Sequence, residues 1–111
     1  MFSSIRRFHH SSLSRNVSKV QLTLFSKQSC GLCDTAKSVL EQVMQKPNYK
    51  ACKYKVVDIL KPDNKEWFDK YCFDVPVLHV HNVENASAEE VGKLFHRLDE
   101  KKVQDLVEKF K

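Results

Sequence analysis

Residues 20–44 read VQLTLFSKQSCGLCDTAKSVLEQVM, and two hydrophobic periodicities meet inside this segment. Residues 20–25 are β-branched and apolar with partial alternation, which predicts a strand. After residue 30 the apolar positions recur at helical spacing, and Asp34 falls in the first turn. These apolar positions are Ala36, Val39, Leu40, Val43 and Met44. The segment therefore predicts a strand that leads directly into a helix, with a C-x-x-C motif at the junction.

The spacing of Cys30 and Cys33 is typical of a redox pair when the two residues open a helix that follows a strand. A sulfur at a helix N-terminus faces unpaired N–H groups, so we expect the pKa of the Cys30 thiol to be lowered. Lys27 adds a cation nearby, and Gly31 leaves the approach to Cys30 open. Cys33 lies one turn further along the helix, within reach of a disulfide formed on Cys30. The motif therefore predicts dithiol–disulfide exchange.

Three other roles are compatible with a single C-x-x-C motif. A structural zinc site needs four ligands, commonly from a second such motif or a pair of His. Cys52 and Cys72 stand alone, and His79 and His81 alternate along one expected strand, so we predict no metal site. The pair can also hold an iron–sulfur cluster between two chains with an external thiol, or be buried and unreactive. A non-catalytic adaptor or an iron–sulfur cluster carrier is therefore the alternative to an enzyme.

Further along the chain, strands and helices alternate before two strands follow each other. The expected elements are a strand at 51–59, a helix opened by Pro62 and Asp63, a strand at 75–80, a polar connection at 82–92, a strand at 93–98 and a helix capped by Asp99. The order β-α-β-α-β-β-α predicts an α/β domain with a four-stranded mixed sheet and three flanking helices. The sequence has no internal repeat or linker, so we expect residues 20–111 to form one domain.

The positive charge of the chain is concentrated near its start. Residues 1–19 hold four of the 19 Lys and Arg and none of the 14 Asp and Glu, which leaves 15 basic and 14 acidic residues in the remainder. A surface that binds nucleic acid needs its positive charge on the folded part, so we expect no nucleic-acid partner. The longest apolar run, residues 75–78, is far shorter than the roughly 20 residues of a membrane span, so we expect no membrane partner.

Residues 1–19 also have the composition of a mitochondrial targeting segment. They are rich in Ser, contain Arg and lack acidic residues. Residues 6–11, RRFHHS, resemble the Arg-x-Phe-x-x-Ser signature of presequences that are trimmed in two steps in the matrix. The alternative is a disordered basic tail on a cytoplasmic protein. We therefore expect a location in the mitochondrial matrix, with the cytoplasm as the alternative.

The order of elements and the position of the cysteine pair resemble the glutaredoxin branch of the thioredoxin fold. Within that branch, the chain resembles a small glutaredoxin-like family that was first recorded as a domain of unknown function and has short members in fungi. The matching segments are LTLFSKQSCGLCDTAKSVLEQV (22–43), YKVVDI (54–59), KYCFDVPVLHV (70–80) and LFHRLDEKKVQDLV (94–107). They cover nearly all of residues 20–111, which we therefore expect to be a glutaredoxin-like domain.

The resemblance implies a thioredoxin-like fold in which Cys30 is the exposed nucleophile and Cys33 is the resolving cysteine. It also implies a cis peptide bond between Val75 and Pro76, beside the dithiol. This agrees with the general rule that cis peptide bonds are inexpensive only before proline. Such a turn presents the backbone of Val75 to an extended substrate. The expected substrate-binding residues are Lys27, Gly31, Leu32, Val75 and Pro76.

Two features differ from glutaredoxins that use glutathione. Gly31 takes the place of the usual Pro after the first cysteine. Those proteins also carry a Gly-Gly pair and an acidic residue after the third strand, where we expect residues 81–85, HNVEN, to lie. We therefore expect a thiol–disulfide oxidoreductase that requires no cofactor and does not depend on glutathione, although glutathione stays possible as its reductant. The expected substrates are disulfide-containing proteins or low-molecular-weight thiols, and the expected state is a monomer.

The remaining singled-out residues are expected to be structural. We expect Cys52 and Cys72 to be small core residues rather than a second redox pair. Asp58 is expected to cap a loop or a helix, and the alternative is a buried proton acceptor for the dithiol. We expect Trp67, Phe68 and Tyr71 to be aromatic residues of the core. We expect His79 and His81 to be neutral and either exposed or half-buried.

Overall fold

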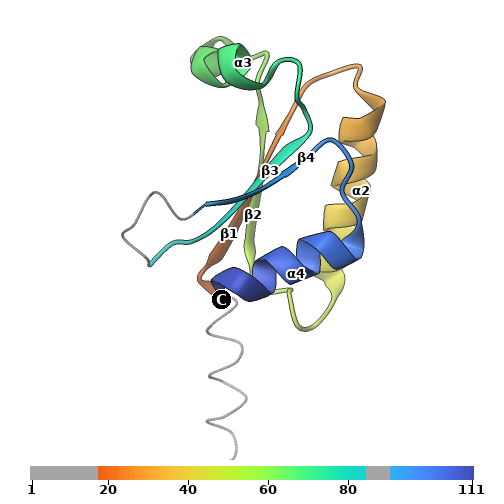
Figure 1. Ribbon diagram of the computed structural model, residues 1–111, viewed down its shortest axis with the longest axis vertical. Coiled ribbons are helices and arrows are strands. Elements are labelled where there is room, and N and C mark those ends of the chain that lie inside the picture. Colours follow the sequence, from red (N-terminus) through yellow and green to blue (C-terminus); the bar gives the residue numbers. More distant parts are fainter. Residues whose placement is uncertain (1–17, 85–90) are drawn as a thin grey trace, which may run out of the picture.

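The computed structural model describes residues 18–84 and 91–111, and Figure 1 shows how their helices and strands are arranged. In chain order the elements are β1 (Val20–Ser26), α2 (Gly31–Gln45), β2 (Lys53–Asp58), the 3-10 turn η1 (Pro62–Asn64), α3 (Lys65–Tyr71), β3 (Val77–Asn82), β4 (Gly92–Phe95) and α4 (Glu100–Phe110). This order is the β-α-β-α-β-β-α order that the sequence predicts.

The four strands form one mixed sheet in the order β2-β1-β3-β4. β2 runs parallel to β1, and α2 makes the crossover that a parallel pair requires. β3 runs antiparallel to β1, and β4 runs antiparallel to β3. The predicted α/β fold class, with a mixed sheet and three flanking helices, is therefore confirmed.

Helices α2 and α4 cover one face of the sheet (Figure 1). Every second residue of the central strands points into this layer, including Leu22, Leu24 and Val80, none of which is exposed. The helices contribute Ala36, Leu40, Val43, Val103 and Val107. Asp99 caps α4 as expected, because its Oδ1 accepts a hydrogen bond of 2.8 Å from the backbone N–H of Lys102.

Helix α3 covers only one end of the opposite face. It has seven residues and is therefore about 10 Å long. Trp67 and Tyr71 lie four residues apart on one stripe and pack on Phe25, with ring centroids 4.5 and 5.4 Å away. Phe68 lies off this stripe and is 38% exposed, so the prediction that it is a core residue is wrong. A helix this short buries one stripe only.

The strand bounds differ from the prediction. β1 runs one residue further, to Ser26, β2 spans Lys53–Asp58 rather than 51–59, and β3 ends at Asn82 rather than at residue 80. β3 begins at Val77 rather than at residue 75, because the Val75–Pro76 turn precedes it. β4 spans Gly92–Phe95 rather than 93–98. It ends early because His96 adopts a left-handed backbone with φ of 66°, which turns the chain out of the sheet toward α4.

Most of the expected targeting segment, residues 1–17, lies outside the described residues. Lys19 is described, and its Nζ forms an ion pair of 2.9 Å with Glu84 beside the start of β1. Across residues 18–84 and 91–111, every helix is too short or too polar to cross a membrane.

Candidate active site

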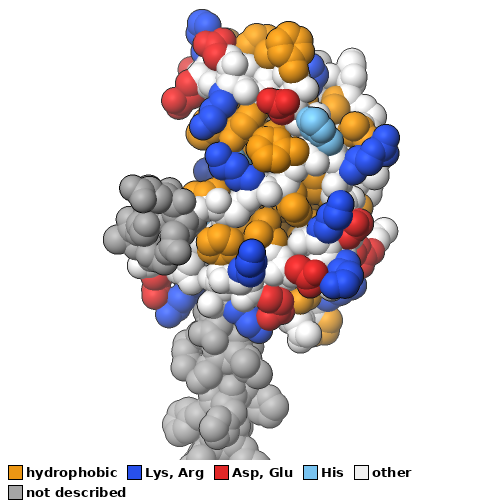
Figure 2. Space-filling model, in the orientation of Figure 1, with side chains coloured by type: hydrophobic (Ala, Val, Ile, Leu, Met, Phe, Trp, Pro, Cys, Tyr) orange, Lys and Arg blue, Asp and Glu red, His pale blue; other side chains and the backbone are white. Residues whose placement is uncertain are grey.

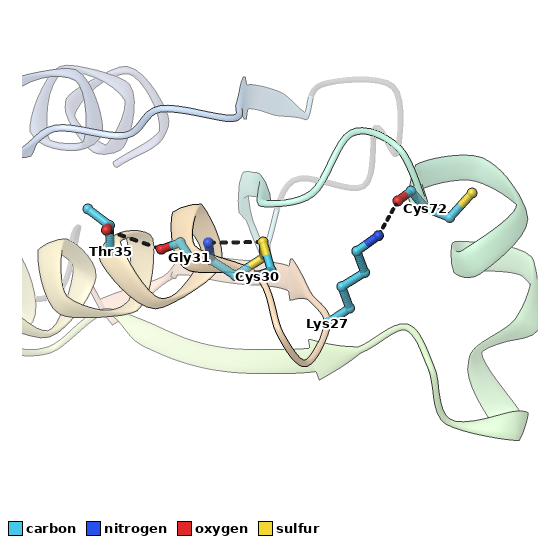
Figure 3. The surroundings of a disulfide bond; sticks show 6 residues. Lys27, Cys30, Gly31, Thr35 and Cys72 are labelled. Carbon is cyan, nitrogen blue, oxygen red and sulfur yellow. Dashed lines mark hydrogen bonds between the residues drawn. A yellow bond between two sulfur atoms is a disulfide. The ribbon is translucent and has the colours of Figure 1, made fainter.

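The cysteine pair sits where the chain leaves β1 and enters α2. Cys30 is the N-cap of α2, with an extended backbone, and its Sγ accepts a hydrogen bond of 3.2 Å from the backbone N–H of Cys33. The two Cα atoms are 5.2 Å apart, and the two sulfurs are joined in a disulfide (Figure 3). The prediction that the two sulfurs lie within bonding reach is therefore confirmed.

The two bonded cysteines lie at different depths. Cys33 has no exposed surface and packs in a cluster with Ile59, Tyr71 and Val77, whereas Cys30 is half-buried and reaches the surface. Gly31 is exposed, and a Cβ added to it would meet no atom within 4 Å. The approach to Cys30 is thus open from outside, while Cys33 is reached only through Cys30.

The segment before β3 lies against the dithiol. The peptide bond between Val75 and Pro76 is cis, as the resemblance implies. Val75 is 8% exposed and packs in the same cluster as Cys33. The backbone N–H of Val75 donates a hydrogen bond of 3.2 Å to the carbonyl oxygen of Tyr71. This N–H is therefore already engaged before an extended substrate arrives.

Lys27 reaches away from the disulfide. Its Nζ donates a hydrogen bond of 2.9 Å to the carbonyl oxygen of Cys72, at the end of α3, as Figure 3 shows. This bond ties the β1–α2 loop to α3. Lys27 also lines a polar cavity of about 350 Å³ together with Lys37, Lys61 and Asp58. Lys27 is therefore a cation of the loop before the dithiol, and its ammonium group donates to a backbone oxygen rather than pointing at the sulfurs.

The turn between β4 and α4 borders the dithiol region, and sequence reasoning missed it. The backbone N–H of His96 donates a hydrogen bond of 2.8 Å to the carbonyl oxygen of Pro76. The His96 Nε2 atom lies 3.8 Å from the Asp74 Oδ1 atom. The sequence carries no local signal for this contact, because it depends on the pairing register of β3 with β4.

Residues 81–85, expected to follow the third strand, begin inside it, because β3 runs to Asn82. In the sheet, Asn82 pairs with Val20, at the start of β1, whereas Cys30 follows the end of β1. Residues 81–84 are therefore at the far end of the sheet from the disulfide, and residue 85 lies outside the described residues.

The exposed side chains of Phe73 and Phe95 were also missed, whereas Leu32 is one of the predicted substrate-binding residues. Phe73, two residues before Val75, is 93% exposed. Leu32, between the two cysteines, is 38% exposed, and Phe95 is 45% exposed at the end of β4. They come from the cysteine motif, from the segment before the Val75–Pro76 turn and from the end of β4.

Three other singled-out residues have structural roles. Asp58 accepts a hydrogen bond of 2.9 Å from the backbone N–H of Leu60, so it caps the loop after β2 as expected. Cys52 is 8% exposed in the core beneath α2 and α4, and burial raises the pKa of its thiol to about 11. Cys72 is half-buried and packs in the other cluster. The expectation that Cys52 and Cys72 do not form a second pair is confirmed, because both are free thiols in separate clusters.

His79 belongs to an aromatic cluster on the α3 side of the sheet. Its Nε2 lies 2.8 Å from the Tyr71 hydroxyl oxygen, and its ring packs against Phe25. Burial, followed by the positive charges of Lys93 and Lys70, lowers the pKa of His79 to about 4. The expectation of a neutral, half-buried His79 is confirmed. Among the described residues, no group of three or more His, Cys, Asp or Glu is arranged to hold a metal ion.

Comparison with known proteins identifies similar sequences. A family model described as a glutaredoxin-like domain (DUF836) matches residues 21–108, which include both cysteines and the Val75–Pro76 turn. The chain is also similar to the glutaredoxin-like protein YDR286C homolog of Dictyostelium discoideum, with 30% identity over 64 residues. The aligned part is 56% of this chain and 58% of that relative, so the chain spans less than two thirds of the relative's length.

Solved structures share the fold at low sequence identity. Thioredoxin O2 from Arabidopsis thaliana, in its oxidised state, has a TM-score of 0.61 at 18% identity, over 93% of this chain and 86% of that one. The N21Q mutant thioredoxin from Halobacterium salinarum has a TM-score of 0.63 at 22% identity, over 90% and 83% of the two chains. These likenesses show the thioredoxin fold.

Proposed function

Since this chain belongs to the glutaredoxin-like family (DUF836), we propose that it is a thiol–disulfide oxidoreductase whose redox couple is Cys30 and Cys33. The observation that carries the proposal is the unequal burial of two bonded sulfurs at the start of α2. An exposed sulfur at a helix N-terminus suits a nucleophile, and a buried sulfur one turn away suits a group that reacts only within the protein.

The first half of the reaction is attack by the reduced protein. The Cys30 thiolate attacks one sulfur of a substrate disulfide and forms a mixed disulfide, and the other substrate sulfur leaves as a thiolate that takes a proton from water. The N–H of Cys33, 3.2 Å from the Cys30 sulfur, and the positive end of α2 stabilise the attacking anion. We therefore predict a lowered pKa for the reduced Cys30 thiol.

The second half resolves the mixed disulfide. Cys33 loses its proton and attacks the Cys30 sulfur, which forms the intramolecular disulfide and releases the second substrate thiolate. The substrate gains two electrons, and the Cys30–Cys33 dithiol loses two. Two molecules of a low-molecular-weight thiol, or one protein dithiol, must then return two electrons to the protein and become a disulfide.

The substrates favoured by the surface are disulfides in proteins. Leu32 exposes apolar surface between the two cysteines, and Phe73 and Phe95 expose more before the Val75–Pro76 turn and at the end of β4; a polypeptide can cover such surface and a small hydrophilic thiol cannot. Disulfides of low molecular weight are the second class, because the space above Gly31 is open.

Glutathione is a possible reductant, but two groups that would contact it already make hydrogen bonds within the protein, although Lys27 keeps two further N–H donors. Lys27, which would pair with a carboxylate, donates to the Cys72 carbonyl, and the Val75 N–H donates to the Tyr71 carbonyl. We therefore propose that a dithiol donor reduces the Cys30–Cys33 disulfide faster than glutathione does. Stopped-flow reduction of the oxidised protein by each donor at equal thiol concentration tests this order.

Single cysteine substitutions test the proposed activity. Cys30→Ser is expected to abolish turnover of a disulfide-linked reporter protein, whereas Cys33→Ser is expected to accumulate a mixed disulfide that mass spectrometry detects. Cys72→Ser is the matched control and is expected to retain activity, since Cys72 is half-buried at the edge of the same region but is not bonded. The wild-type couple should have a potential of roughly −180 to −270 mV. If Cys30→Ser turns over substrate at the wild-type rate, the chain is a non-catalytic module instead.

We further propose that residues 1–19 direct the protein to the mitochondrial matrix, on the basis of their composition. A fluorescent fusion of residues 1–19 should accumulate in mitochondria, and Arg6→Glu with Arg7→Glu should leave it in the cytoplasm.

A further inference from the structure

The sheet face on the α3 side is only partly covered, and its register places side chains in rows. Where α3 lies, the row is apolar and consists of Val57, Phe25, Val77 and Phe95. The next row toward the start of β1 is Lys55, Thr23, His79 and Lys93. The row after that contains Lys53, Gln21 and His81. The face therefore changes from apolar to basic at the point where α3 ends.

Among the described residues, the two rows beyond α3 hold positive side chains and no acidic one. Lys53, Lys55 and Lys93 are exposed. Elsewhere the charges are mixed, since positive and negative side chains alternate over α4 in Figure 2 and Lys101 pairs with Asp105 there. The folded part has nearly balanced charge, so this concentration of Lys is a local property.

A groove of about 290 Å³ marks the boundary between the apolar and basic rows. Lys55 and His81 line it on the basic side, and Trp67 lines it at the end of α3. The half-buried His79 forms part of its wall. The groove therefore offers apolar surface at one end and cationic groups at the other.

We propose that this basic face, defined by Lys53, Lys55 and Lys93, docks an acidic, extended segment of a partner protein. Lys53 and Lys55 are alternate residues of β2, about 7 Å apart. Alternate acidic side chains of an extended peptide have the same spacing, so two carboxylates of such a segment meet two ammonium groups.

The aromatic rings favour a polypeptide over a nucleic acid. A strand of bases needs open ring faces on which to stack. Phe25 is 2% exposed, and Trp67 is half-buried, stacked on Tyr71 at 12° and approached by Lys70 at 5.8 Å. These rings are occupied by one another, which leaves the Lys residues as the groups that meet a ligand.

The basic face is separate from the dithiol. Thr23 lies three residues before the end of β1, so the Lys55–Lys93 row is about 10 Å from the end of the strand that leads to Cys30. A partner held there leaves the exposed sulfur free to react. Exchange with a small disulfide should therefore be the same whether or not the basic face is occupied.

Binding of a fluorescein-labelled peptide, Glu-Ser-Glu-Ser-Glu-Ser-Glu, to the full oxidised chain tests the proposal by fluorescence anisotropy. We expect Lys55→Glu with Lys93→Glu to weaken binding by about tenfold or more, because two attractions become repulsions. The matched control, Lys102→Glu with Lys109→Glu, changes the net charge equally on exposed positions of α4 and should weaken binding less than threefold. Amide chemical shifts should move at residues 21–23 and 79–81.

Four results would overturn the proposal. They are an absence of peptide binding, an equal loss in both double variants, a wild-type chain that dimerises through this face, and tighter binding of a single-stranded oligonucleotide with the same dependence on Lys55 and Lys93. Light scattering detects the dimer. Thermal unfolding of each variant checks that the fold is retained, and turnover of a small disulfide should be unchanged in both double variants.

Discussion

The two faces of the sheet differ in how completely helices cover them and in the kinds of side chain they present. Beneath α2 and α4 the strands present Leu22, Leu24, Leu78 and Val80, all fully buried, and two amphipathic helices cover them from end to end. On the other face a single short helix covers one end. There the residues are aromatic, polar and basic, and the cluster includes the buried sulfur of Cys33. The larger core therefore lies on one face, and the dithiol lies where the smaller cluster meets the start of α2.

The largest effect is expected from removing core volume on the helix-covered face. Leu24→Ala should lower the free energy of unfolding by about 2–5 kcal/mol, because Leu24 has no exposed surface and its removal leaves a cavity. Thr23→Ala, one residue earlier and on the opposite face, should cost about 1 kcal/mol or less. Urea unfolding of the oxidised proteins measures both. Equal losses would show that the two faces contribute alike to stability.

A smaller effect is expected from acid, and it should arise on the α3 face. The pKa of His79 is about 4 in the folded protein, against 6.5 for an unperturbed histidine, so the unfolded chain binds the proton first as the pH falls. The contribution of neutral His79 is complete above pH 6.5 and is lost between pH 6.5 and pH 4. Allowing for solvent screening at a half-buried site, we expect a loss of roughly 1–2 kcal/mol.

Urea unfolding at pH 7 and pH 4.5 measures this loss, and His79→Gln should reduce the difference between the two pH values. His96→Gln is the matched control, since His96 is exposed and lies outside the buried cluster. An identical pH dependence in wild type and His79→Gln would exclude His79 as the source.

A third test compares the two glycines. A Cβ on Gly92 would lie 2.6 Å from the Leu106 side chain and 2.8 Å from that of Phe110, beneath α4. Both contacts are with the ends of flexible side chains, so Gly92→Ala should cost about 1 kcal/mol. Gly31→Ala meets no atom within 4 Å and should leave the melting temperature nearly unchanged. A larger loss for Gly31→Ala than for Gly92→Ala would contradict these packing contacts.

The smallest effect on stability is expected at the exposed Phe73, two residues before Val75. Phe73→Ser should change the free energy of unfolding by less than about 0.5 kcal/mol, because the side chain is 93% exposed. The same substitution should lower kcat/KM for a protein disulfide severalfold and leave turnover of a small disulfide unchanged. Val83→Ser, 42% exposed at the far end of the sheet, is the matched control. An equal loss of kcat/KM in both variants would contradict a contact of Phe73 with protein substrates.

Local patterns predicted the junction that carries the dithiol. A change from strand to helix periodicity around Cys30 is visible in adjacent residues, as is the cap at Asp99, because each depends on neighbours in sequence. The contact of His96 with Pro76 depends on how β3 pairs with β4, and adjacent residues do not fix that register. The prediction for Phe68 failed for a related reason, since its burial depends on which stripe of α3 meets the sheet.

The depth of the two bonded sulfurs has a consequence for chemical damage. Hydrogen peroxide or an alkylating drug that diffuses to the reduced protein meets Cys30 first, because Cys33 is shielded by the surrounding side chains. A sulfenic acid formed on Cys30 condenses with the neighbouring Cys33 thiol into the disulfide, with loss of water, before a second oxidising molecule arrives. The buried Cys33 thiol therefore converts an oxidised Cys30 into a disulfide, which thiol reductants can reduce again.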